Sequence, residues 1–285
     1  MQRYWFGDVE DGGCCPADGN PASVAERAAT LGVSMETFVP LDWRIAQECG
    51  FVRDREEYIA KLREVTMHLA REKIAERFRG GDAELLSMVR MLDDLDSVIN
   101  LLNERAAEWY LVAHPTFSRK YRTMPARKMI AIVGRQARGG MKQVAEEIDR
   151  LYAARTALMQ EVSARAFEVL PNTSALVGGL VAARLLSRAG SLEALSRMPA
   201  STIQVLGSER ALFSHLRSGT PPPKHGIIFQ HRRVHNAPKA VRGRVARVLA
   251  AKVGIAARLD YHRGAADPAF IREASARIDA AGEAA

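Results

Sequence analysis

Apolar residues recur at alternating spacings of three and four through the middle of the chain. Such spacing places apolar side chains on one face of a helix and, when sustained, is typical of coiled coils. The first seam comprises Leu85, Met88, Leu92, Leu95, Ile99, Leu102, Ala106 and Trp109. The second comprises Met141, Val144, Ile148, Leu151, Leu158 and Val162, with Arg155 interrupting one core-type position. Two long helices are therefore predicted.

The segment between these helices, residues 113–140, carries turn signals at Pro115, Pro125 and Gly139-Gly140. It predicts a tip that joins the two helices into a hairpin. Two interpretations remain open: ordinary core helices of a bundle, or a coiled coil that also recruits a second copy of the chain. The paired seams favour the second. Dimerisation is then assigned to Leu92, Leu95, Ile99, Leu102, Ile148 and Leu151.

Residues 1–52 predict a small α/β unit. Tyr4-Trp5-Phe6 indicates a short strand, residues 11–21 a turn-rich loop, and residues 23–31 a helix that ends near Gly32. From Arg53 the pattern becomes helical, and a helical, coiled-coil region is expected over 53–170. Its first helix is expected to share one face among Ile59, Leu62, Thr66 and Leu69.

After residue 170 the elements become shorter. Residues 171–186 predict one helix whose small side chains permit close helix packing, and glycines and prolines then cut the chain into short helices. A last long helix is expected over 240–261. Its apolar side comprises Val241, Val245, Val248, Leu249, Ile255 and Leu259. Arg244, Arg247 and Arg258 group on another side, either as a solvated face or as part of an RNA surface.

The positive charge is concentrated in the C-terminal part. The chain has a formal net charge of +8. Residues 171–285 hold 17 Lys and Arg against 7 Asp and Glu, a net of +10, whereas residues 1–170 carry −2. The basic residues alternate with apolar ones, so we assign them to a folded domain that faces an acidic partner rather than to a tail.

Cysteine content and hydropathy indicate the compartment. Cys14, Cys15 and Cys49 are odd in number and no pair has zinc-binding spacing, so reduced thiols in a cytoplasmic protein are expected. The N-terminus lacks the pattern of a signal peptide, and no apolar run approaches the length of a membrane span.

Residues 199–235 gather the candidate chemistry: five Lys or Arg, four His and a single acidic residue, Glu209. A metal site at His225, His231 and His235 is disfavoured by irregular spacing and cationic surroundings. Nucleophilic catalysis by Ser201 or Ser208 lacks a nucleophile elbow and an acid partner. No phosphate-loop or dinucleotide motif follows Gly178-Gly179. We therefore expect no enzyme activity, no cofactor and no metal.

Anion binding is the interpretation that remains for this stretch. Gly207 and Ser208 are suited to a helix start with Ser208 as the N-cap, where free backbone N–H groups attract phosphate. Arg210 follows in the first turn, and Glu209 stabilises the helix start or holds Arg210. A plain capped helix with a solvated Arg210 is the alternative. The RNA-binding residues are predicted to be Gly207, Ser208, Glu209, Arg210, Arg217, Lys224, His225, Gln230, His231 and Arg232.

The C-terminal part resembles the Nop domain of archaeal box C/D ribonucleoprotein scaffolds and their nucleolar and spliceosomal relatives. The resemblance runs in order through PNTSALVGGLVAARLL (171–186), LEALSRMPASTIQVLGSERALFSHL (192–216), PPKHGIIFQH (222–231) and VRGRVARVLAAKVGIAARLDY (241–261). Residues 91–110 also resemble the family's first coiled-coil helix. Two positions of the family's Gly-Ala-Glu-Lys motif differ, as Ser208 and Arg210, and Arg232 replaces a frequent proline.

The resemblance implies a mainly α fold: a long coiled-coil helical hairpin and an all-helical Nop domain over 171–285, with a reduced α/β unit over 1–52. It implies a non-catalytic scaffold that grips box C/D guide RNA with a kink-turn-binding protein and positions fibrillarin, which methylates ribose 2′-hydroxyls of rRNA or tRNA. Because the N-terminal unit is shorter than in relatives, an RNA-binding adaptor without the methyltransferase is the alternative.

Overall fold

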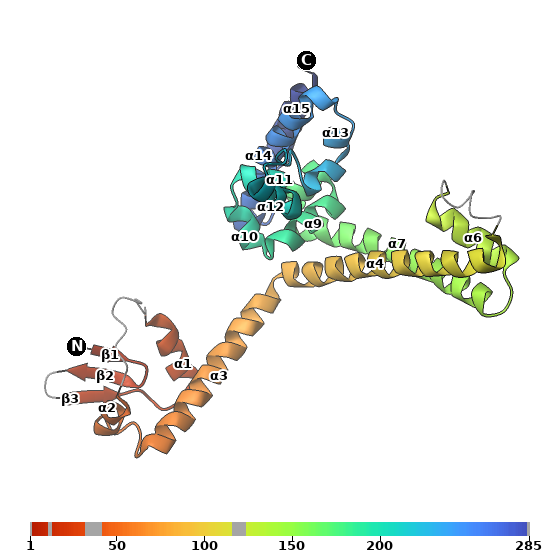
Figure 1. The fold of residues 1–285 in the computed structure, drawn as a ribbon. Helices are drawn as coiled ribbons and strands as arrows, with labels where there is room; N and C mark the ends of the chain where they lie inside the picture. Colours follow the sequence, from red (N-terminus) through yellow and green to blue (C-terminus); the bar gives the residue numbers. More distant parts are fainter. Residues whose placement is uncertain (1, 11–12, 32–41, 116–123, 284–285) are drawn as a thin grey trace. The chain divides into compact units, whose positions relative to one another are not determined.

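The fold is mainly α, as expected, and forms two compact units over Met1–Gly80 and Gly81–Ala285 in the computed structural model (Figure 1). The structure describes residues 2–10, 13–31, 42–115 and 124–283. The predicted tip lies partly outside these ranges, at residues 116–123.

The N-terminal unit packs helices against a three-stranded antiparallel sheet of order β1-β2-β3. Its elements are β1 (Gln2–Tyr4), β2 (Gly7–Glu10), β3 (Gly13–Pro16), α1 (Pro21–Thr30), α2 (Trp43–Glu48) and α3 (Arg55–Arg79). The sequence prediction was wrong in two places. The first strand ends at Tyr4 because Trp5 and Phe6 form the turn to β2, and the expected loop contains β3. The Phe6 side chain is fully buried and forms part of the core of this unit.

Helix α3 belongs to this unit, and its buried face differs from the predicted one. Tyr58 and Val65 are buried in the unit's core, with Leu62 and Leu69 packed against it. Ile59, by contrast, is 50% exposed. The buried face of α3 therefore includes Leu62 and Leu69 as predicted, but it passes through Tyr58 and Val65 instead of Ile59 and Thr66. Apolar side chains such as Ile59 and Met67 remain on the outer side of the helix.

A disulfide joins Cys14 of β3 to Cys49 at the end of α2, and Cys15 is the free, exposed cysteine. The expectation of three reduced thiols was therefore wrong. The two partners are 35 residues apart, and only the packing of α2 near the sheet brings their Cα atoms to 5.1 Å. Sequence spacing alone carries no signal for such a pairing.

The second unit begins with the predicted hairpin. Helices α4 (Gly81–Ala113) and α7 (Gly140–Val169) run side by side, and α6 (Ala126–Gln136) packs against both at the tip (Figure 1). The core positions Leu85, Leu92, Ile99, Ile148 and Val162 are each at most 2% exposed. Trp109 departs from the predicted seam because the buried face of α4 passes instead through Tyr110.

Arg155, which interrupts the second seam, is matched by an acidic residue across the hairpin. Its guanidinium donates to both carboxylate oxygens of Asp96 in α4. The pair is partly buried. A charge at a seam position is thus tolerated because an opposite charge faces it, which also fixes the register of the two helices.

The rest of the second unit is a bundle of helices. They are α8 (Pro171–Val177), α9 (Gly179–Ala189), α10 (Leu192–Arg197), α11 (Ala200–Val205), α12 (Glu209–Ser218), the 3-10 turn η3 (Ile227–Gln230), α13 (Arg232–His235), α14 (Lys239–Arg263) and α15 (Pro268–Glu283). The helix predicted over 171–186 is broken at Gly178, whose φ is +83°. The break lets Gly179 pass so close to α7 that a Cβ there would lie 2.3 Å from the Ser163 carbonyl oxygen.

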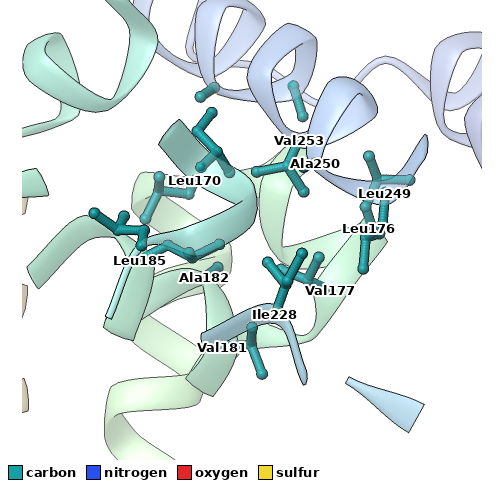
Figure 2. Close-up of a cluster of buried hydrophobic side chains, with 14 of the residues drawn as sticks. Leu170, Leu176, Val177, Val181, Ala182, Leu185, Ile228, Leu249, Ala250 and Val253 are labelled. Atoms are coloured by element: carbon teal, nitrogen blue, oxygen red, sulfur yellow. The ribbon is translucent and has the colours of Figure 1, made fainter. Parts of the chain in front are cut away.

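Helix α14 runs through the centre of this bundle. Leu249, Ala250 and Val253 are fully buried and lie across from Leu176 and Leu170 (Figure 2). Ile255 was expected on the apolar side but is 39% exposed. On the basic side, Arg244 and Arg258 donate hydrogen bonds to the carbonyl oxygens of Ala281 and Ser196. These two arginines therefore tie helices together.

Candidate nucleic-acid interface

Two loops from the basic stretch are joined by main-chain hydrogen bonds. The Gly226 N–H donates to the Gln204 carbonyl and the Ile227 N–H to the Leu206 carbonyl, each at 2.8 Å. The Gln204 side-chain amide also donates to the Lys224 carbonyl at 2.8 Å. The end of α11 and the segment before η3 consequently form one rigid piece of backbone.

Glycines make this close approach possible. A Cβ at Gly226 would lie 2.0 Å from the Leu206 carbonyl oxygen. Gly207 has a φ of +86°, a conformation that other residues rarely adopt, and a Cβ there would lie 2.6 Å from Ile227. The two glycines are thus required by geometry at the junction of the loops.

The 3-10 turn η3 is anchored in the core and presents polar neighbours at the surface. Ile228 is fully buried and lies beside Val177 and Val181 (Figure 2). The His225 and Phe229 rings stack with centroids 4.3 Å apart, and the Arg242 guanidinium lies over Phe229 at 5.4 Å. Burial of the ring lowers the pKa of His225 below its usual value, so the imidazole is neutral near pH 7.

The start of α12 differs from the predicted cap. Ser208 occupies the N-cap position, but its side chain caps no helix N–H and donates instead to the Val205 carbonyl. Glu209 reaches back and accepts a hydrogen bond from the Gly207 N–H at 2.7 Å. Glu209 therefore bonds to the turn that precedes the helix, and the capping role predicted for Ser208 is wrong.

Helix α12 lies at the surface of the bundle, and none of its residues is buried. Arg210, Phe213 and Arg217 line one shallow depression of about 580 Å³. Phe213 and Leu216 are 62% and 70% exposed. An amphipathic helix with both bare apolar and basic side chains has the character of a contact surface rather than of a solvated helix.

Gln230, His231 and Arg232 follow one another at the exit from η3 and line a second depression of about 500 Å³. Arg232 is exposed. Burial, reinforced by Arg233 and Arg232, lowers the pKa of His231 to about 4. The neighbouring Arg233 is bound to Asp279 of α15 by two close contacts of 2.7 and 2.8 Å, and so is held in the fold.

The structure thus places the predicted residues in two groups. Gly207, Lys224, His225, Gln230, His231 and Arg232 lie around the joined loops, and Arg210 and Arg217 lie on α12. Sequence reasoning missed Arg184 of α9, whose guanidinium donates a hydrogen bond to the side-chain amide oxygen of Gln230 at 2.5 Å. An arginine among the buried small residues of α9 was the available signal, because such a charge is rarely buried without a partner.

Across the described ranges, no cluster of three or more His, Cys, Asp or Glu side chains is arranged to hold a metal ion. Within the same ranges, no helix combines the length and apolar character needed to cross a membrane.

Comparisons with known proteins agree on one family. Residues 123–280 match the family model described as Nop, snoRNA binding domain, fibrillarin. An uncharacterised NOP5-family protein of Methanocaldococcus jannaschii is 34% identical over 255 residues, which are 77% of this chain and 62% of that protein. Nucleolar protein 58 of Dictyostelium discoideum is 32% identical over 63% of this chain and 34% of its own length. The chain therefore spans less than two thirds of these relatives.

A solved structure is similar along nearly the whole chain. A chain of the fibrillarin/Nop5p complex has a TM-score of 0.55 and 28% sequence identity, and the similarity covers 97% of this chain and 98% of that one. The similarity therefore includes the N-terminal unit as well as the helical bundle.

Proposed function

The chain belongs to the Nop family, and on that premise we propose that it is a non-catalytic RNA-binding scaffold of a cytoplasmic box C/D guide ribonucleoprotein. In this proposal it binds guide RNA and positions fibrillarin for 2′-O-methylation of ribose in rRNA or tRNA. The scaffold contributes proximity and orientation, and the methyltransferase contributes the chemistry. No cofactor is assigned to the scaffold.

One observation carries the proposal: the family match over residues 123–280 contains the joined loops and α12, where the exposed basic residues lie. A rigid backbone that displays Lys224, Gln230 and Arg232 is suited to contacts with phosphates and 2′-hydroxyls. Because main-chain bonds hold the backbone of the joined loops, little backbone conformational entropy is lost when RNA binds.

Helix α12 is proposed to contact the kink-turn-binding protein and RNA together. Its bare Phe213 and Leu216 supply apolar area for a protein surface, and Arg210 and Arg217 supply charge for RNA beside it. The two groups of predicted residues then have different partners, with the joined loops on RNA and α12 at the junction of RNA and protein.

The N-terminal unit is proposed to dock fibrillarin through the outer side of α3. A groove of about 670 Å³ there is lined by Pro21, Glu56, Ile59, Ala60, Arg63, Glu64, Met67, His68 and Arg71. Ile59 and Met67 are 50% and 48% exposed, so the groove offers apolar area at its centre with charges along its rim. The inclusion of this unit in the similarity to the fibrillarin/Nop5p complex supports the assignment.

Dimerisation through the hairpin is proposed as well, on a surface next to the predicted one. Leu92, Ile99 and Ile148 are covered by the chain's own hairpin, with Leu95, Leu102 and Leu151 half-buried beside them. A second, bare apolar row on α4 comprises Met91, Val98, Leu101, Trp109 and Val112, each 45% exposed or more. We infer that this row contacts a second copy of the chain, while the residues predicted from the sequence pack between the two helices of the hairpin.

The test is reconstitution. A kink-turn RNA, the kink-turn-binding protein, fibrillarin and the full chain are combined, and complexes are followed by gel shift and size-exclusion chromatography at moderate salt. We expect the chain to join the RNA only when the kink-turn protein is bound, and fibrillarin to co-elute. Failure to form the complex of chain, RNA and kink-turn protein overturns the proposal.

A second candidate is an RNA-binding adaptor without a methyltransferase partner. The same reconstitution separates the two. RNA binding with fibrillarin eluting alone favours the adaptor, and loss of fibrillarin co-elution in Ile59→Glu or Met67→Glu, with RNA binding retained, favours the scaffold.

A further inference from the structure

Arg184 contacts both the hairpin and the end of η3 beside the joined loops. It lies in α9 with its side chain only 20% exposed. One terminal nitrogen, Nη1, donates to Oε1 of Gln230 at 2.5 Å, and the other, Nη2, lies 3.9 Å from Oδ2 of Asp96 in α4. Asp96 in turn binds Arg155 of α7. A line of polar contacts therefore runs from both hairpin helices through α9 to the end of η3.

The chemistry of the guanidinium group fixes the orientation of the Gln230 amide. A guanidinium has only donors, so the amide must turn its oxygen toward Arg184. Its Nε2 group, with two N–H donors, consequently faces away from α9. Gln230 is otherwise exposed, and an exposed glutamine without such a partner would sample several rotamers and both amide orientations.

The surroundings of this amide are polar and open. Gln230 and Arg184 line a depression of about 290 Å³ together with Arg188, Ser187, Asp93 and Gly207. Gly207 belongs to the turn before α12, so the depression lies between α9 and the joined loops. Within the described part of the chain, Nε of Arg184 is buried and has no hydrogen-bond partner.

We propose that Arg184 is a positioning residue: it holds the Gln230 amide with its N–H groups toward an acceptor oxygen of the RNA backbone, and Asp96 holds Arg184. This inference rests on the proposed RNA-binding function. It makes RNA affinity depend on a carboxylate in the hairpin that itself never touches RNA. In this proposal Arg155 and Asp96 support RNA binding in addition to fixing the register of the two hairpin helices.

The direction in which one substitution changes the RNA affinity separates this inference from simple electrostatics. Removing the negative charge of Asp96 makes the protein more basic, and long-range electrostatics alone would strengthen RNA binding. Loss of the contact to Arg184 has the opposite effect, because Arg184 and then Gln230 gain freedom that must be lost again on binding. We therefore expect Asp96→Asn to weaken RNA binding.

The experiment is a double-mutant cycle on the complex of full chain, kink-turn RNA and kink-turn protein, with affinity measured by fluorescence anisotropy. Arg184→Gln and Gln230→Ala are each expected to weaken binding about 5- to 20-fold, and the double variant no more than the stronger single one. Arg188→Gln removes the same charge nearby, and its effect is expected to add to that of Gln230→Ala. Circular dichroism and thermal melts of each variant confirm folding.

The outcomes distinguish this inference from the proposed function. If Arg210→Ala weakens binding while Arg184 and Gln230 contribute additively, or if Asp96→Asn binds as tightly as the natural chain or more tightly, the positioning role is excluded and the RNA-binding function stands. If the natural chain forms no complex, the proposed function itself fails. Should Arg184→Gln unfold, Arg184→Lys provides the second test. It keeps the positive charge but cannot contact Gln230 and Asp96 with two separate nitrogens, so we expect weaker binding, whereas electrostatics alone predicts no change.

Discussion

Asp260, near the end of α14, caps the N-terminus of α8 by accepting hydrogen bonds from Asn172, which lies 88 residues earlier in the chain. One carboxylate oxygen accepts both the main-chain and the side-chain N–H of Asn172, at 2.8 and 2.9 Å. The other oxygen accepts the Thr173 N–H at 2.9 Å. The Asp260 side chain thus accepts hydrogen bonds from N–H groups at the start of α8, where Asn172 and Thr173 are fully buried.

This contact gives the first prediction. Asp260→Ala leaves several buried donors without an acceptor, so the free energy of unfolding should fall by about 3 to 5 kcal/mol. Asp279→Ala, which removes a half-exposed partner of Arg233, is the control and should cost about 1 kcal/mol or less. Urea unfolding followed by circular dichroism measures both, and equal losses would contradict the assignment.

A second prediction concerns the Cys14–Cys49 disulfide. Under non-reducing conditions the native chain should react with one equivalent of maleimide, at Cys15, and with three after reduction and denaturation. Cys49→Ser should destabilise the N-terminal unit by about 3 to 4 kcal/mol, because the disulfide restricts the unfolded chain. Cys15→Ser is the control and should unfold like the natural chain. Three reactive thiols in native protein would show that the bond does not form.

A third prediction follows from His231. Its pKa is about 4 in the fold and about 6.5 in an unfolded chain, so the unfolded state binds more protons between these values. The His231 contribution to stability is complete above about pH 6.5 and is lost as the pH falls toward 4. His231→Gln should therefore flatten the fall in melting temperature over this range. Identical slopes for the natural chain and His231→Gln would count against a neutral, buried imidazole.

The fourth prediction tests the joined loops. Gly226→Ala places a methyl group against the Leu206 carbonyl and should separate the two segments, with a loss of both thermal stability and RNA affinity. Gly243→Ala in α14 is the matched control, because a Cβ there would meet no described residue outside its own helix within 4 Å. It should be neutral or stabilise the helix by up to about 1 kcal/mol. Gly226→Ala with unchanged RNA affinity would exclude the loops from the interface.

The fifth prediction separates the hairpin core from the proposed dimer surface. Ile99→Asp puts a charge into a seam position that is 2% exposed and should unfold the hairpin. Val98→Glu with Leu101→Glu changes only bare side chains, so the chain should keep its helicity and become a monomer. Light scattering and circular dichroism distinguish the two. A Val98 and Leu101 variant that keeps the mass of a dimer would move the interface elsewhere.

Much of the helical architecture could be predicted because it depends on the local spacing of apolar residues along the chain. The hairpin seams depend on spacings of three and four, and residues such as Leu92 and Ile148 lie in its core as expected. Periodicity fails where a helix has two apolar sides. On α3 the choice between Ile59 and Tyr58 is made by contact with α1 and the sheet, which no pattern within α3 can encode.

The candidate interface was predictable in its residue types and only partly in its geometry. The glycines and basic residues of 199–235 indicated an anion-binding surface, but Ser208 was expected to cap α12 and instead donates to the Val205 carbonyl. The outcome depends on the turn at Gly207, which is set by the approach of Ile227 from another segment.

The sequence by itself determined the helical class, the hairpin, the basic C-terminal half and the Nop resemblance, because each depends on the order and spacing of residues along the chain. Only the tertiary structure decided the pairing of Cys14 with Cys49, the closure of α8 by Asp260, and the line from Asp96 through Arg184 to Gln230. These are contacts between residues 35 to 88 positions apart. Their partners are selected by how the helices pack, and helix packing is a property of the whole core.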